Sequence, residues 1–213
     1  MIWHGGIFRA LGILAVLLLD GSFGFTQAED VVTPPTDKRA LAVVLPALQR
    51  DPVADGVVSP DEWERAWRSS PFVSIGGERG EVETRVRIGQ TDSGLWFLFE
   101  CDEPLMENLR TVETRRQSKI WLDDSVEVFL DADGDRRTYH HLVVNAEGVC
   151  YGARGSSPPL QGYDDLWDAP IRWGFKKEQD RWTAELFIPF AALSEMKPGR
   201  WGVNLCRNRQ AAD

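Results

Sequence analysis

The densest group of side chains that could do chemistry is the acidic run from Ile120 to Asp135, IWLDDSVEVFLDADGD. Asp124, Asp131 and Asp133 lie in this run, and carboxylate oxygens are the ligands that calcium prefers, so these three are candidate metal ligands and structural calcium is a candidate cofactor. DADGD matches the first ligand positions of an EF-hand loop. However, position twelve counted from Asp131 is Leu142, where a bidentate Glu is required. The run is therefore not an EF-hand, and a hairpin turn without metal is the alternative.

Catalytic side chains are scarce. The only histidines after position 28 are His140 and His141, and adjacent residues of a strand point to opposite faces, so they cannot cooperate. No nucleophile elbow, phosphate loop or zinc signature is present. With 33 acidic residues, a pair such as Glu127 and Asp124 can always be proposed as a glycosidase pair, so the pairing carries no information. We predict that these residues form no enzyme.

The amino-acid composition limits the classes of binding partner to be expected. There are 33 acidic and 24 basic residues, a formal net charge of -9, which opposes binding to phosphate backbones and makes nucleic acid an unexpected partner. Hydrophobic residues make up 43% of the chain, enough for a substantial core. Nine Trp could stack on an extended neutral ligand such as a sugar, although Trp also fills cores.

The first 28 residues have the pattern of a secretory signal peptide. Arg9 precedes an apolar run from Ala10 to Leu19, and small residues lie near Ala28. The run is too short for a membrane-spanning helix, which needs about 20 apolar residues. We therefore expect export to the periplasm or the extracellular space, with no transmembrane segment in the mature chain. Residues 29–46, rich in Pro and charge, are expected to form a linker, and residues 47–213 the domain.

Three cysteines, Cys101, Cys150 and Cys206, allow at most one internal disulfide, and their spacing lacks any CxxC pattern. Export makes one bridge plausible, and Cys101 with Cys206 is the pair we name because both end apolar strand-like runs. Three small buried thiols are the alternative.

The elements around these residues are mostly strands. Ser59-Pro60 starts a short helix, and the FAALSEM segment can form a helical turn. From Val82 to Ile88 apolar and polar residues alternate, and after a turn LWFLFEC continues as a buried strand, which predicts a hairpin. Further strands are predicted at 125–131, 139–145, 171–176, 181–188 and 200–206. The pattern indicates an all-β, jelly-roll-like antiparallel β-sandwich with short helical turns.

Six blocks occur in an order that resembles the family 9 carbohydrate-binding modules, within the wider group of DOMON-like β-sandwiches. They are Asp55-Gly56 with Glu62-Trp63, LWFLFECDE, IWLDDSVEVFLDADGD, YHHLVVNAEG, WTAELFIPFAAL and WGVNLCR. The resemblance covers roughly residues 51–213. It implies a non-catalytic module that binds an oligo- or polysaccharide, and it allows an attached enzyme domain in a longer chain. Structural calcium is also common in this family.

The resemblance assigns roles to three residues. Trp121 would stack on a sugar ring, Glu127 would accept sugar hydroxyls, and Asn145 would hydrogen-bond to them. The alternatives are a Trp that caps the sheet, an exposed edge charge and a turn-capping Asn. Val143 stands where the family has an Arg that contacts hydroxyls, so the choice of ligand is open.

The family's second stacking Trp follows the W-G-x-N strand, and this sequence ends soon after that strand, at Asp213. A sandwich that ends there would leave the last strand with an unpaired edge, so we expect a C-terminal truncation.

Two other functions remain open. Some relatives in the same superfamily hold haem, and Met106 with His140 or His141 could supply a His/Met axial pair. A structural or adhesive sandwich without a small ligand is the third class.

Overall fold

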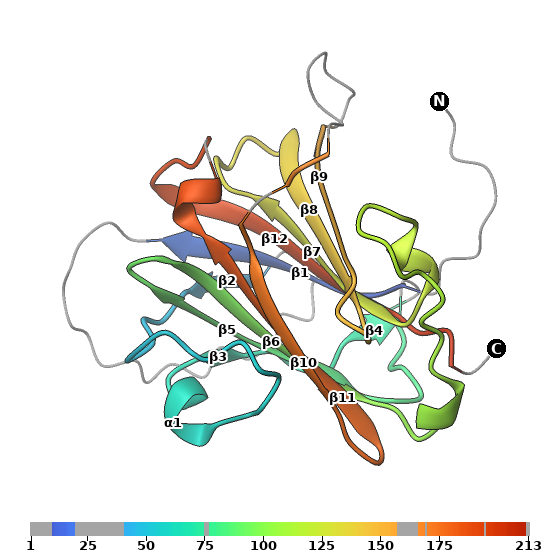
Figure 1. Cartoon of the computed structure of the whole chain (residues 1–213). Helices are drawn as coiled ribbons and strands as arrows, with labels where there is room; N and C mark the ends of the chain where they lie inside the picture. Colours follow the sequence, from blue (N-terminus) through green and yellow to red (C-terminus); the bar gives the residue numbers. More distant parts are fainter. Residues whose placement is uncertain are drawn as a thin grey trace.

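The computed structural model describes residues 10–19, 41–74, 77–156, 166–168, 170–193 and 195–211, with the backbone alone for 10–19 and 41. These residues form two β-sheets that pack on one another (Figure 1). Sheet A contains β1 (Ala10–Leu19), β2 (Leu41–Val44), β4 (Val73–Ser74), β7 (Ser125–Asp131), β8 (Thr138–Asn145), β9 (Cys150–Ser156) and β12 (Gly199–Asn208). Sheet B contains β3 (Trp67–Arg68), β5 (Thr84–Thr91), β6 (Gly94–Asp102), β10 (Arg172–Lys177) and β11 (Arg181–Pro189). The short helices are α1 (Pro60–Trp63), η1 (Met106–Asn108), η2 (Ile120–Leu122) and η3 (Phe190–Ala192).

The strand order is β2-β1-β12-β7-β8-β9 in sheet A, with β4 paired to β1, and β10-β11-β6-β5-β3 in sheet B. Among the named strands described, every pair is antiparallel except β1 with β2. The predicted antiparallel β-sandwich is confirmed, and so is the predicted hairpin, formed by β5 and β6.

Alternation along β7 decides which of its residues face the core. Val126, Val128 and Leu130 are at most 1% exposed and belong to the core cluster between the sheets. Since successive side chains of a strand point to opposite faces, Glu127 and Phe129 lie on the outer face of sheet A. The predicted division of β7 into two faces is thus confirmed, and the face that carries Glu127 points away from the core.

The N-terminal segment differs from the sequence-based expectation. Ala10–Leu19, within the predicted signal peptide, is strand β1, and the rest of residues 1–28 lies outside the described residues. The signal peptide stays a prediction. Val43 and Leu45 are buried in the core although they fall in the predicted linker, because β2 pairs with β1 in sheet A. Packing therefore begins before the expected boundary at Ala47.

The edge of β12 is occupied. We expected it to be unpaired, but β1 pairs along its whole length, from Ala10 opposite Asn208 to Leu19 opposite Gly199. The expectation of an unpaired last strand is therefore wrong.

A buried carboxylate joins two sequence blocks that lie far apart along the chain. Glu185 on β11 is fully buried and accepts hydrogen bonds from the N–H groups of Asp55 (2.9 Å) and Gly56 (2.8 Å) and from the Trp63 indole (2.8 Å). Burial raises the pKa of Glu185 to about 7, against the opposing effect of these donors. Gly56 has φ +78°, and a Cβ there would lie 2.4 Å from the backbone carbon of Phe175, so only glycine fits.

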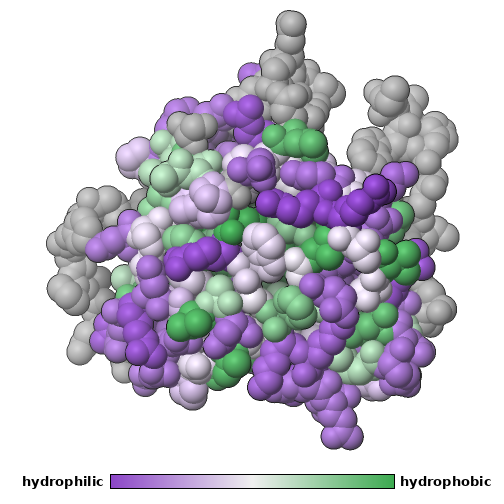
Figure 2. Space-filling view, viewed as in Figure 1, coloured by the Kyte–Doolittle hydropathy of each residue, from purple (hydrophilic) through white to green (hydrophobic). Residues whose placement is uncertain are grey.

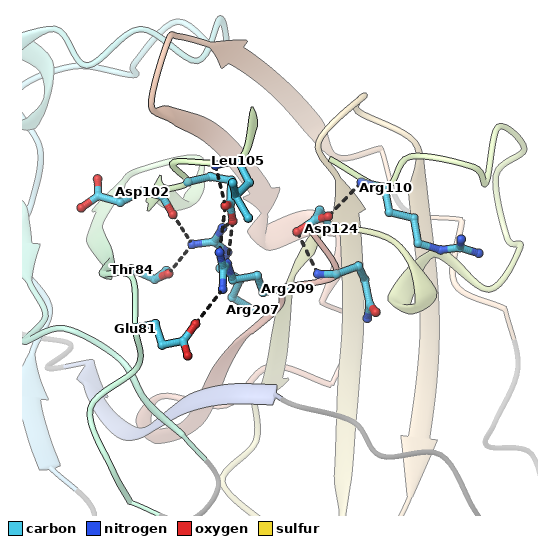
Figure 3. Close-up of polar contacts among 10 residues, drawn as sticks. Glu81, Thr84, Asp102, Leu105, Arg110, Asp124, Arg207 and Arg209 are labelled. Atoms are coloured by element: carbon cyan, nitrogen blue, oxygen red, sulfur yellow. Dashed lines mark hydrogen bonds and ion pairs between the residues drawn. The ribbon is translucent and has the colours of Figure 1, made fainter. Parts of the chain in front are cut away.

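A second buried network ties the two sheets together at the start of the loop after β6 (Figure 3). Arg207, on β12 of sheet A, donates to Thr84 Oγ1 (3.0 Å), to the Asp102 carbonyl (2.8 Å) and to Glu103 Oε2 (3.0 Å). Arg209 adds two bonds to Glu103, at 2.7 and 3.0 Å. Burial opposes ionisation of Glu103, but the bonds from Arg209 and Leu105 and the two guanidinium charges outweigh it and lower the pKa of Glu103.

The disulfide that we named does not form. All three cysteines are free thiols, because Cys101 faces the core between the sheets while Cys206, opposite Glu127, faces the other side of sheet A. No described helix is long and apolar enough to cross a membrane. On the face shown in Figure 2, hydrophobic residues form small separate areas among hydrophilic ones.

Candidate functional site

The candidate site lies on the outer face of sheet A. The loop at residues 103–124 positions Trp121, which belongs to this site. Two buried carboxylates hold this loop. Asp123 accepts from the N–H groups of Val112 (3.0 Å) and Glu113 (2.9 Å), and Asp124 accepts from the Arg110 N–H (2.9 Å). A loop tied at these points can present a side chain in a fixed place although it has little regular structure.

Trp121 lies in η2, between fully buried Ile120 and exposed Leu122. Its indole is partly buried and meets the ring of Tyr151 edge to face, with the ring centroids 5.1 Å apart. Tyr151 on β9 pairs with Val143 on β8, and Val143 pairs with Glu127 on β7. This register places Trp121 over the same outer face as Glu127. Trp121 is thus outside the core cluster and is partly exposed.

Glu127 has two protein partners. Its Oε1 accepts from Asn208 Nδ2 at 2.6 Å, and its Oε2 lies 2.5 Å from Nε2 of His141. The side chain is 9% exposed, so the alternative of an exposed edge charge does not describe Glu127. An ionised carboxylate can accept about four hydrogen bonds, so Glu127 keeps capacity for further donors.

Asn145 has a different role from the one expected. It is fully buried, and its Nδ2 donates to the Glu113 carbonyl (3.1 Å) and to Asp123 Oδ2 (3.0 Å). Its Oδ1 accepts from the N–H groups of Glu147 (3.1 Å) and Val149 (2.8 Å). With both donors and the acceptor engaged, Asn145 has nothing left for a sugar hydroxyl, and the turn-capping alternative describes it.

The three candidate metal ligands are not brought together. Asp124 lies just before β7 and Asp131 ends it, and a strand rises about 3.3 Å per residue, so the two are roughly 20 Å apart. Asp124 is fully buried, and burial raises its pKa despite hydrogen bonds from Arg110 and Gln210. It holds the loop and the chain after β12 in place, as Figure 3 shows.

Asp131 and Asp133 do meet, together with Asp135, with carboxylate oxygens within 4.8 Å of one another. However, Asp131 already accepts from the N–H groups of Gly134 (2.7 Å) and Arg136 (2.9 Å), and Asp133 pairs with Lys197 Nζ at 2.7 Å. An ammonium in direct contact competes with a cation. These oxygens thus already serve the hairpin turn and an ion pair, as in the metal-free alternative, and calcium at Asp131 and Asp133 stays a prediction.

Several residues of this face were missed in the sequence. His141 and Asn208, the two partners of Glu127, supply polar groups where the family's Arg is replaced by Val143, which is fully buried. The missing information was the β7–β8–β12 register, which places His141 opposite Phe129 and Asn208 opposite Ser125. The alternation on β7 already placed Phe129 on this face and was the one usable signal.

The axial pair proposed for haem is not assembled. His140 pairs with Leu130 near the far end of β7, whereas Met106 lies a few residues before the Arg110–Asp124 contact at its start. His140 faces the core against Trp167, and burial lowers its pKa. About 20 Å of strand separates the two ends, so His140 and Met106 cannot share one iron. His141 points to the outer face, where it contacts Glu127, whereas Met106 packs against the core between the sheets.

Comparison with known proteins gives similarity at the level of structure. No family model matches the sequence, and no curated protein matches it. A family 9 carbohydrate-binding module from Caldicellulosiruptor kristjanssonii in complex with cellotriose has a TM-score of 0.53 at 19% identity, covering 78% of this chain and 84% of that one. The same module with glucose gives 0.52 at 19% identity, covering 78% and 86%. A candidate carbohydrate-binding protein from Bacteroides uniformis gives 0.59 at 14% identity, covering 76% and 81%. The chain therefore has the β-sandwich fold of these proteins.

Proposed function

We propose that this β-sandwich binds carbohydrate and catalyses no reaction, in an exported protein. The binding surface is the outer face of sheet A, with Trp121 as the stacking residue and Glu127 as a hydrogen-bond acceptor. Support comes from two directions. The first is the fold, shared with modules solved in complex with cellotriose and glucose. The second is the chemistry of the residues on that face.

The observation that carries the proposal is the arrangement of Trp121 and Glu127. A partly exposed indole and a carboxylate with remaining acceptor capacity lie over the same face, joined through Tyr151 and Val143. A pyranose presents a face of C–H groups to an aromatic ring and a rim of hydroxyls to an acceptor. An apolar ligand would not use Glu127, and a phosphate would be repelled by it.

Substitution of Trp121 tests the proposal. Trp121→Ala should abolish measurable binding with the fold intact, because its ring contributes contact area to the ligand and little to the core. Loss of such a contact corresponds to about 1 to 3 kcal/mol, roughly one to two orders of magnitude in affinity. Binding is measured by titration with soluble oligosaccharides and by pull-down on insoluble glycans. Glu127→Gln should weaken binding less, since the amide oxygen still accepts.

The matched control is Leu122→Ala. Leu122 belongs to the same short helix, is 37% exposed and offers no ring. If the loss of binding in Trp121→Ala comes from the missing ring and not from a disturbed helix, Leu122→Ala should leave binding unchanged. Unchanged binding in Trp121→Ala, or unfolding of that variant, would return Trp121 to a structural role and overturn this site.

Structural calcium stays a prediction, as do an attached enzyme domain and the signal peptide. A structural or adhesive sandwich without a small ligand is the second candidate. It becomes the better description if no glycan binds.

A further inference from the structure

A row of aromatic rings continues from Trp121 across the outer face of sheet A. Tyr151 follows Trp121 at 5.1 Å between ring centroids, His141 follows at 5.7 Å, Phe129 at 4.0 Å and Tyr139 at 5.9 Å. We call these five residues the aromatic strip. All five side chains are partly exposed. The strip therefore extends the partly exposed aromatic surface beyond Trp121.

The strand register makes the strip continuous. Phe129 on β7 is directly opposite His141 on β8, and their rings stack at an interplanar angle of 11°. Tyr139 lies two residues further along β8, on the same face. From Val143, the partner of Tyr151, to Tyr139 is four residues of β8, or roughly 13 Å. One pyranose ring cannot cover that length.

Small residues on β9 leave room for the Tyr139 ring, at the end of the strip, to lie close to sheet A. Gly155 is opposite Tyr139, and a Cβ at Gly155 would lie 2.4 Å from Cζ of the Tyr139 ring. Ala153 is opposite His141. Because these positions carry little or no side chain, the Tyr139 ring lies against the sheet instead of standing away from it. The Tyr139 ring is partly exposed in this position.

The charges of the strip are compensated within the protein. Glu127 is the carboxylate beside it, and His141 and Asn208 both contact that carboxylate. Among the described residues, the surface thus combines partly exposed aromatic rings with a carboxylate that is already paired. A neutral chain with alternating apolar faces and hydroxyls is the ligand that matches this chemistry.

We propose that the aromatic strip binds several consecutive sugar residues of an unbranched neutral glycan. Trp121 takes one ring, and the Phe129–Tyr139 end takes rings further along the chain. This inference rests on the function proposed above and extends it from a single sugar ring to the length of the ligand. It predicts that affinity rises with chain length.

The experiment compares short and long members of neutral oligosaccharide series. Wild-type protein is titrated calorimetrically with glucose, xylose and mannose and with the β-1,4-linked hexasaccharide of each sugar. In at least one series the hexasaccharide should bind more tightly than its monosaccharide. Phe129→Leu and Tyr139→Leu, which keep apolar volume and remove the aromatic face, should each weaken that hexasaccharide roughly 3- to 10-fold and leave the monosaccharide unchanged.

The control is Phe175→Leu, a similar change to a partly buried ring on β10 of sheet B. It should alter neither affinity, and thermal unfolding checks that all variants fold. Equal affinity of wild type for monosaccharide and hexasaccharide, or equal weakening of both by Phe129→Leu, would overturn the strip while leaving the Trp121 site standing. No binding of any member of the three series would overturn the proposed function itself.

Discussion

Replacing Glu103 with Gln tests the buried network that joins the sheets. The side chains of Glu103 and Arg207 are both 0% exposed, so the variant leaves a guanidinium buried without its counter-charge. Breaking a buried pair in this way destabilises a protein by about 3 to 5 kcal/mol. Whole domains are stable by only about 5 to 15 kcal/mol. Glu103→Gln should therefore lower Tm by roughly 10 °C, if about 2 to 4 °C corresponds to each kcal/mol in a domain of this size.

Urea unfolding followed by Trp fluorescence measures the change, and the chain offers a matched control. Glu81 pairs with the same Arg209, at 3.4 Å, but its side chain is 86% exposed. Glu81→Gln should therefore change the free energy of unfolding by less than about 1 kcal/mol. The double variant Glu103→Met/Arg207→Met, which removes both charges, should be more stable than Glu103→Gln.

The effect of Glu103→Gln should also depend on pH in a defined direction. The pKa of Glu103 is lowered in the folded protein, so its contribution is present above the unfolded carboxyl pKa and is lost as pH falls through the folded one. The gap between wild type and Glu103→Gln should thus shrink in acid. A loss of under about 1 kcal/mol at neutral pH, or a double variant no more stable than the single one, would refute the reasoning.

Three further predictions concern other parts of the sandwich. Burial raises the pKa of Glu185 from 4.5 to about 7 in the folded protein, so the folded state holds a proton that the unfolded state releases as pH rises. Between about pH 4 and pH 8, the free energy of unfolding of wild type should therefore fall by about 3 kcal/mol more than that of Glu185→Gln, as measured by urea titration. At low pH, Glu185→Gln should be less stable than wild type, because its amide NH2 cannot accept the hydrogen bond of the N–H donor that it faces. Gly56→Ala should destabilise by more than about 1 kcal/mol in thermal unfolding, because of its positive φ and the Phe175 backbone. EDTA should leave Tm unchanged if the Asp131 turn is complete without metal, whereas a fall in Tm that calcium reverses would show a calcium site.

The parts of the fold that the sequence predicted are those with a regular period. β5, β7 and β11 alternate apolar and polar residues, and each was expected as a strand. β9 was missed because its sequence, CYGARGS, contains two glycines and has no alternation. It forms a strand because β8 pairs with it and its small residues leave space for neighbouring rings.

The candidate site was predictable only in part. The placement of Glu127 opposite to Val126 and Val128 followed from the two-residue period of a strand. The contact between Glu127 and His141 depends on the register of β7 with β8, and no local pattern encodes it. Asn145 shows the same limit, since an amide that could serve a ligand is used entirely by the loop and the turn.

The three free cysteines can serve as natural probes of local and global opening of the fold. Burial raises the pKa of each thiol to about 12, so almost no reactive thiolate exists while the surroundings stay closed. A thiol reagent can then react only after a local or global opening, and its rate gives the free energy of that opening. Cys101 lies between the sheets, whereas Cys206 lies opposite Glu127 on the outer face. A ligand held on that face should therefore slow the reaction of Cys206 at least as much as that of Cys101, without any engineered probe.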